Sequence, residues 1–355
     1  MTDIVCFAKD WDDDPTSNTH VMRLLARRHR VLWLNSIGMR TPRLASGRDL
    51  GRLARKLRSA LGGARQAAPG LWVASPIVLP LPHSRIASAL NRVLLRVTVA
   101  ALRRRLGMRR FQLWTFLPNA VDYVGRLGES LVVYYCVDDW LHAAGFDGPR
   151  LRAMEQTLCQ RADLVFATAH GLVATLRAWN PETHLAPHGV DHAHFARALD
   201  PATAMAPEVA RLPRPVLGVI GLIDERVDLE LVAALARARP AWSIAIVGRT
   251  AVETGALARQ PNVHFLGRQP YARLPEFCRG FAAGLIPFRV NDYTRHVNPI
   301  KLREYLSAGL PVVATALPEV ARYAEWCRVV EDRAALDQLG VRIGQAFARQ
   351  DVVVL

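Results

Sequence analysis

The stretch NPIKLREYLSAGLPVVAT, residues 298–315, decides the fold of this 355-residue chain. Pro299 suits the first turn of a helix, and Gly309 with the nearby Pro311 ends that helix before the apolar strand PVVAT. A short helix that leads directly into a buried strand is typical of a parallel α/β sheet. In such sheets, ligands bind outside the carboxyl ends of the strands, which is where this helix begins.

Apolar, β-branched runs alternate with helical segments along the rest of the chain, which predicts two doubly wound parallel sheets. The predicted strands are 3–8, 30–36, 71–79, 111–118, 131–138, 164–170, 184–190, 215–221, 243–249, 262–268, 281–289, 310–316 and 327–332. A segment rich in Ala and Pro and without periodicity separates the two halves. The sequence therefore predicts an N-terminal domain over 1–200, a linker over 201–213 and a C-terminal domain over 214–355, with a last helix over 333–349.

The composition excludes several classes of protein. Apolar residues make up 51% of the chain and charged residues 22%, which excludes a disordered, collagenous or coiled-coil protein. No run reaches the roughly 18 uncharged residues that a membrane-spanning helix needs, and the N-terminus lacks the basic region of a signal peptide. The five cysteines form no CxxC pair, which favours reduced, buried thiols over structural zinc. We therefore expect a cytoplasmic protein.

The net charge of +15 is concentrated in one segment. Residues 40–110 contain sixteen Arg or Lys and a single acid, Asp49, so this segment carries the whole net charge. Within it, 83–106 is predicted to form a basic amphipathic helix, and its apolar residues at helical spacing are Ile86, Leu90, Leu94 and Val97.

Such a helix commonly lies on an anionic membrane surface, which would place the protein at the inner face of the plasma membrane. An ordinary domain helix with a positive outer face is the alternative. A nucleic-acid-binding protein is a further alternative, but the aromatic residues do not alternate with the arginines as stacking platforms would. We therefore expect no nucleic-acid partner.

The motifs of the commonest α/β enzymes are absent. No G-x-G-x-x-G follows a strand, and the chain lacks G-x-x-x-x-G-K-[ST], G-x-S-x-G and H-E-x-x-H. These absences argue against a dinucleotide-dependent oxidoreductase, a P-loop NTPase, an α/β-hydrolase and a zinc protease.

Lys301 and Glu304 make the start of the 299–308 helix chemically informative. The free N–H groups of a helix N-terminus and a lysine side chain suit a phosphate group. Glu304 lies one turn after Lys301 on the same helix face, where its carboxylate could accept two hydrogen bonds from ribose hydroxyls. A surface ion pair is the alternative interpretation of an isolated K-x-x-E.

This segment resembles the signature of GT-B glycosyltransferases of the glycogen-synthase-like group (family 4, group 1 type), usually written E-x7-E followed by A-x-G-x-P-V-V. Glu304 matches the second glutamate, whereas His296 stands at the position of the first. A P-x-K-x-x-E-Y pattern is usual in the subgroup of the teichuronic-acid type, and Pro299, Lys301 and Tyr305 fit it.

The resemblance implies a GT-B fold, with two Rossmann-like domains facing a central cleft, and a hexosyl transfer that is retaining and metal-independent. It implies a nucleoside-diphosphate sugar as donor substrate, no cofactor, and a glycan or glycolipid as acceptor in cell-surface polysaccharide synthesis. A sugar-nucleotide epimerase of GT-B shape is the alternative. The donor-binding residues implied are Gly221, Arg226, Gly248, Gly267, Arg268, Asn298, Pro299, Lys301 and Glu304.

Candidate acceptor-side residues follow two strands of the first half. Asp138 and Asp139 end the buried strand in VVYYCVDDW, and either carboxylate could position the acceptor hydroxyl or assist its deprotonation. Asp12, Asp13 and His20 follow the first strand and are predicted to bind the acceptor. The alternatives are turn and helix-capping roles, or a D-x-D metal site of the GT-A type at 12–14; we expect no metal.

Overall fold

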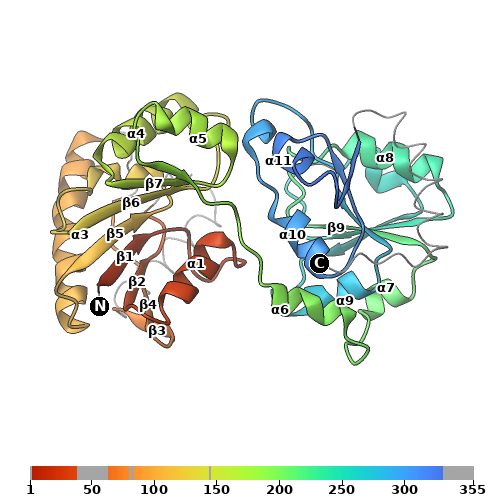
Figure 1. Ribbon diagram of the computed structural model, residues 1–355, viewed down its shortest axis with the longest axis horizontal. Coiled ribbons are helices and arrows are strands. Elements are labelled where there is room, and N and C mark those ends of the chain that lie inside the picture. The colour runs from red at the N-terminus through yellow and green to blue at the C-terminus, as the bar shows by residue number, and fades with distance from the viewer. Residues whose placement is uncertain (1, 38–62, 80, 82–83, 144, 331–355) are drawn as a thin grey trace. The chain divides into compact units, whose positions relative to one another are not determined.

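The computed structural model describes residues 2–37, 63–79, 81, 84–143 and 145–330 (Figure 1). The predicted helix 333–349 and the cations of 40–58 lie outside these residues. The chain divides after Pro187 into two compact units, each built around its own mainly parallel sheet. The predicted α/β class with parallel sheets is confirmed.

The first unit contains an eight-stranded sheet in the order β3-β4-β2-β1-β5-β6-β7-β8. Its strands are β1 (Asp3–Phe7), β2 (Val31–Leu34), β3 (Arg65–Ala68), β4 (Leu71–Ala74), β5 (Phe111–Thr115), β6 (Leu131–Cys136), β7 (Leu164–Ala167) and β8 (Thr183–Leu185). Every neighbouring pair is parallel except β3 with β4. Strand β3 was not predicted from the sequence, because its residues RQAA are half-buried or exposed and include no β-branched residue.

Helices and one 3-10 turn connect these strands. They are α1 (Ser17–Leu25), α3 (Arg85–Arg105), η1 (Pro118–Asp122), α4 (Gly148–Arg161) and α5 (His170–Arg177). Parallel strands need such crossovers, and their apolar faces bury the sheet. Met22 and Ala26, for example, pack with Ile4, Cys6 and Trp33 in one core cluster.

Helix α3 exposes an apolar stripe. The side chains of Ile86, Leu90, Val93 and Val97 form this α3 stripe, with Ile86 83% exposed and Val97 63% exposed. Leu94 was predicted to lie on that face but is half-buried, because Leu95 beside it faces the core. Val93 takes the place of Leu94 in the exposed stripe.

The second unit contains a six-stranded, wholly parallel sheet in the order β11-β10-β9-β12-β13-β14. Its strands are β9 (Val216–Ile220), β10 (Ser243–Val247), β11 (Val263–Gly267), β12 (Ala283–Ile286), β13 (Val312–Thr315) and β14 (Arg328–Val330). Its helical elements are α6 (His192–Phe195), η2 (Ala196–Leu199), α7 (Pro207–Ala210), α8 (Leu229–Ala238), η3 (Leu257–Arg259), η4 (Tyr271–Arg273), α9 (Leu274–Arg279), η5 (Thr294–His296), α10 (Ile300–Ser307) and α11 (Pro318–Ala321).

Both faces of this second sheet are covered. Val232 and Leu235 of α8 pack on one face, with Leu217 and Val219 of β9. The opposite face packs against α9 and α10, which Figure 1 shows on the other side of the sheet from α8. Burial on both faces explains why these strands are near-continuous apolar runs.

The predicted linker is folded onto the second unit. Phe195 and Val209 are fully buried in the core that α9 and α10 share, and Glu208 forms a two-pronged ion pair with Arg273. The structure therefore differs from the predicted boundary at residue 200, because residues 188–213 bury side chains in the second unit. Composition alone does not reveal two well-placed apolar anchors in an Ala- and Pro-rich segment.

Candidate active site

Three glycines line the carboxyl ends of neighbouring strands in the second unit. Gly221 follows β9, Gly248 follows β10 and Gly267 ends β11. The Gly221 N–H donates to the Val247 carbonyl at 2.9 Å, and the Gly248 N–H donates to the Gly267 carbonyl at 2.9 Å. Backbone hydrogen bonds thus join the three strand ends into one continuous edge.

Only glycine fits two of these positions. A Cβ on Gly248 would lie 1.7 Å from the Gly221 carbonyl oxygen, so a side chain there collides with backbone. Gly221 has a φ of +139°, a conformation that favours glycine. The edge therefore presents bare backbone, as a surface that approaches a phosphate or a nucleoside closely must.

The start of α10 lies against this glycine edge. A Cβ built on Gly221 would be 3.7 Å from Cε of Lys301, which places the lysine stem directly beside the end of β9. Lys301 donates to the Glu304 carboxylate, which is 5% exposed, whereas the lysine side chain is 23% exposed. The predicted donor residues Gly221, Gly248, Lys301 and Glu304 are thus brought together.

Tyr305 fixes the position of α10 on the sheet. Its hydroxyl oxygen accepts the Ile220 N–H at 2.8 Å, and its fully buried ring lies where a side chain on Gly284 would otherwise be. Burial raises the pKa of the Tyr305 hydroxyl well above its usual value, so it stays protonated. This side chain locks the helix carrying Lys301 and Glu304 to the end of β9.

Arg226 is held by a neighbouring carboxylate. Its Nε and Nη2 atoms contact Asp224 at 2.9 and 2.7 Å, and its guanidinium lies 5.7 Å from the centroid of the Phe288 ring. Its charge is therefore balanced within the loop that follows β9. If Arg226 binds the diphosphate of the donor, the diphosphate must share the guanidinium with Asp224.

Three predicted donor residues remain: Asn298, Pro299 and Arg268. Asn298 is buried and accepts a 2.7 Å hydrogen bond from Arg303, whose other Nη atom donates to the Tyr323 hydroxyl. Asn298 therefore supports the segment before α10, and Pro299 is the N-cap residue of that helix. Arg268 follows Gly267 on the same edge and is exposed.

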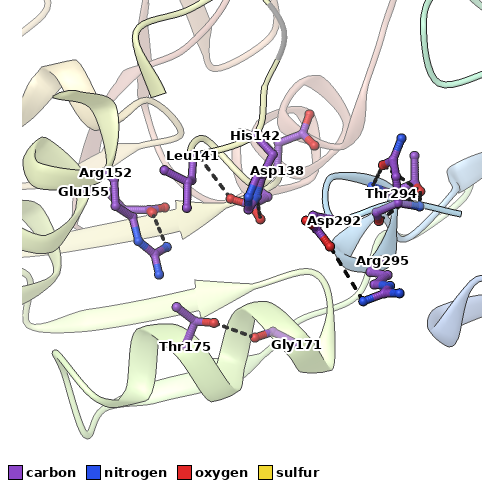
Figure 2. A network of polar contacts seen from close by, with 12 residues as sticks. Asp138, Leu141, His142, Arg152, Glu155, Gly171, Thr175, Asp292, Thr294 and Arg295 are labelled. Atoms are coloured by element: carbon purple, nitrogen blue, oxygen red, sulfur yellow. Dashed lines mark hydrogen bonds and ion pairs between the residues drawn. The ribbon is translucent and has the colours of Figure 1, made fainter. Parts of the chain in front are cut away.

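In the first unit, the loop after β6 carries the two predicted catalytic carboxylates. Asp139 is 4% exposed; its Oδ1 accepts the Leu141 N–H at 3.1 Å and its Oδ2 contacts His142 Nδ1 at 2.9 Å. Asp138 is half-buried and lies in the same loop as His142 (Figure 2). Both oxygens of Asp139 are engaged, and it presents the imidazole of His142, which is 37% exposed.

A buried polar cluster lies beneath this loop. Glu155 of α4 accepts a hydrogen bond from the Tyr134 hydroxyl at 2.6 Å. Arg152 donates to the same carboxylate at 3.3 Å (Figure 2). Burial raises the pKa of Glu155, and Asp139 raises it further. The thiol of Cys136 contacts both Glu155 and the Asp138 carbonyl. The cluster fixes the end of β6, from which the loop departs.

The predicted acceptor residues are on another strand end. Asp12 is exposed and pairs with Arg65, Asp13 is exposed, and His20 is half-buried in α1. They follow β1, which shares its sheet edge with β6, but β5 lies between these two strands. The sheet thus places them on the same edge as Asp138 and Asp139, with one strand between the two groups.

Two features are absent from the described residues. Within the ranges given above, no three His, Cys, Asp or Glu side chains gather in a way that could hold a metal ion. Among the helices of these same residues, none is long and apolar enough to cross a membrane.

Two parallel α/β units in one chain, the second with this glycine edge and Lys–Glu helix, agree with the GT-B fold that the sequence predicts. Residues 214–343, which lie in the second unit, match the family described as glycosyl transferases group 1.

Among individual relatives, the chain is 29% identical over 231 residues to TuaH of Bacillus subtilis strain 168, which is named as a teichuronic acid biosynthesis glycosyltransferase. The match covers 59% of this chain and 56% of the length of that relative. The predicted resemblance to the teichuronic-acid subgroup is confirmed.

Solved structures share the fold over the whole chain. Sucrose-phosphate synthase from Thermosynechococcus elongatus superimposes with a TM-score of 0.69 at 17% identity, covering 98% of this chain and 91% of that one. HepE of Anabaena, in complex with UDP and glucose, gives 0.65 at 14% identity, covering 100% and 92%. At these identities the likeness establishes the GT-B fold, as the sequence predicted.

The hydrogen-bond partners of the predicted site residues were not predicted from the sequence. His142 forms a D-x-x-H pair with Asp139, and this spacing is visible in the sequence once Asp139 is singled out. Glu155 interrupts the apolar stripe of α4 between Leu151 and Leu158, a signal of a buried polar group. No sequence signal indicates that Tyr305 would bond to Ile220, because 85 residues separate them.

Proposed function

We propose that this protein is a glycosyltransferase that moves a sugar from a nucleoside-diphosphate sugar to a hydroxyl of a glycan or lipid-linked acceptor. The observation that carries the proposal is the convergence of Gly221, Gly248, Lys301 and Glu304 at one sheet edge. Bare backbone, a helix start and a cation suit a diphosphate, and a carboxylate suits ribose hydroxyls.

The relatives support the same reaction class. TuaH is named for teichuronic acid biosynthesis, and HepE was solved with UDP and glucose. We infer from them that this chain acts in the synthesis of a cell-surface polysaccharide and uses a UDP-sugar or a similar donor.

In this function Lys301 and the N–H groups at the start of α10 stabilise the negative charge that develops on the departing diphosphate. Glu304 orients the nucleoside through its ribose, and Tyr305 keeps both side chains at the end of β9. Groups held in place before the reaction need no reorganisation during it, which is the main source of electrostatic catalysis.

We further propose that the transfer retains the anomeric configuration and requires no metal ion. Retention follows from the family resemblance, and a cation and a helix start supply positive charge that a metal would otherwise provide. The proposal is tested by titrating the protein calorimetrically with UDP, GDP and ADP, and by following sugar transfer with and without excess chelator.

We expect one nucleoside diphosphate to bind and turnover to be unchanged in chelator. Failure of all three to bind would contradict the donor site. Loss of turnover in chelator that manganese restores would contradict metal independence. The anomeric configuration of the product, read by NMR, tests retention.

We also propose that the first unit binds an anionic membrane surface through α3. The α3 stripe is exposed, and Arg96, Arg104 and Arg105 are exposed on the same helix. On the buried side of the helix, the Asn91 side chain hydrogen-bonds both backbone groups of Leu79 and holds that exposed leucine beside α3. Arg103 is not part of it, since its guanidinium lies 3.8 Å from the centroid of the Phe111 ring.

The double substitution of Val93 and Val97 by Asp is expected to weaken binding to anionic vesicles by at least about tenfold. It removes apolar side chains that the membrane would bury, and it adds negative charges that the anionic headgroups repel. Both side chains are exposed, so folding should be unaffected. Co-sedimentation with phosphatidylglycerol-rich and neutral vesicles, at low and high salt, measures the effect. Leu24→Asp on α1, equally exposed, is the control. Equal recovery of the wild type with both vesicle types at low salt would contradict the proposal.

A further inference from the structure

The Asp139–His142 pair has the geometry of an oriented base. The carboxylate is buried at 4% exposure, the imidazole is 37% exposed, and Oδ2 lies 2.9 Å from Nδ1. An ionised carboxylate can only accept hydrogen bonds, so Nδ1 carries the proton that joins the two side chains. The other ring nitrogen, Nε2, is then left with a lone pair that can accept a proton.

Asp139 itself is poorly suited to touch a substrate. Its second oxygen is taken up by the Leu141 N–H, so both carboxylate oxygens already have partners within the loop. The adjacent Trp140 is also buried, which leaves the imidazole as the more exposed group of the pair. In this arrangement the carboxylate fixes the tautomer and the ring orientation, and the imidazole contacts the substrate.

The structure around the pair is polar and hydrogen-bonded. Tyr134 and Cys136 of β6 donate hydrogen bonds to Glu155 of α4, and the Cys136 thiol also contacts the Asp138 carbonyl in the loop. The charged groups near the pair in the described residues include Asp138 on its own loop and Glu155 with Arg152 on α4. A loop anchored in this way can hold a base in one orientation.

We propose that His142 is the residue that accepts the proton of the acceptor hydroxyl, and that Asp139 is its positioning residue. The inference rests on the proposed glycosyl transfer. As the acceptor oxygen forms its bond to the anomeric carbon, its proton passes to Nε2 of His142. The bond from that carbon to the diphosphate oxygen breaks on the same face of the sugar that the acceptor approaches, which gives the retained configuration proposed above, and its electron pair leaves with the diphosphate. The imidazolium then releases the proton to water.

The test uses the full chain with UDP-glucose as donor probe and octyl glucoside as acceptor probe, followed by release of UDP. His142→Gln is expected to lower kcat at least about 100-fold while leaving the donor KM and the affinity for UDP unchanged. It also changes the pH–rate profile, because the group that accepts the proton is removed. Asp139→Asn lowers kcat as well, because the imidazole loses the partner that sets its tautomer.

His184→Gln is the matched control, because His184 lies 3.5 Å from Glu182 in an exposed histidine–carboxylate pair of the same unit. It should retain wild-type kcat. An NMR spectrum of histidine ¹⁵N shifts adds a readout independent of turnover: Nδ1 of His142 should be the protonated nitrogen in the wild type.

Wild-type kcat and an unchanged pH profile in a folded His142→Gln variant would overturn the assignment while leaving the proposed function intact. Protonation of Nε2 instead of Nδ1 in the wild type would overturn it equally. Absence of UDP binding and transfer in the wild type would instead overturn the proposed function, and this inference with it.

Discussion

Replacement of Gly248 by alanine is expected to destabilise the second unit by about 3 kcal/mol and to abolish donor binding. The new Cβ would lie 1.7 Å from the Gly221 carbonyl oxygen, and both partners are backbone, so no side chain can rotate away. The ends of β9 and β10 must separate, which moves the edge that Lys301 lies against. Differential scanning calorimetry should show the transition of this unit lowered by about 8 °C.

Gly189→Ala is the control for this experiment. No atom lies within 4 Å of a Cβ built on Gly189, so alanine there should change the stability by less than about 1 kcal/mol. A Gly248→Ala protein that melts with the wild type and binds UDP normally would show that the strand ends tolerate a side chain. The glycine edge would then lose its role as a close-approach surface.

Substitution of Glu304 by glutamine is expected to weaken UDP binding by about 2 kcal/mol, or roughly 30-fold. The carboxylate is buried and held by Lys301, and the neutral amide loses both the charge-assisted bonds to ribose and the pairing with the lysine. Isothermal titration with UDP measures the change. A larger loss of affinity for UDP than for free phosphate would place the contact at the nucleoside.

Glu230→Gln, on the exposed surface of α8, is the matched control and should bind UDP as the wild type does. If a folded Glu304→Gln protein bound UDP with unchanged affinity, Glu304 would be removed from the donor site. The Lys301–Glu304 contact would then be the plain i,i+3 ion pair that the sequence left open as an alternative.

Much of the fold could be predicted from local patterns. Thirteen of the strands were expected within a few residues of their observed bounds, because buried parallel strands are continuous apolar runs between helical segments. Two features were not predicted, and both have local causes. Strand β3 is a polar edge strand, and residues 188–213 were not assigned to the second unit because only a few apolar side chains, such as Phe195 and Val209, attach them to it.

By itself, the sequence determined the class of the fold and the chemistry at the start of α10, because both depend on residues close together in the chain. The tertiary structure decided which distant residues meet. Parallel register brings Gly221, Gly248 and Gly267 to one edge, and Tyr305 ties α10 to it. It also decided that Asp139 holds His142, because a loop's path depends on what packs beneath it and not on the spacing of its residues.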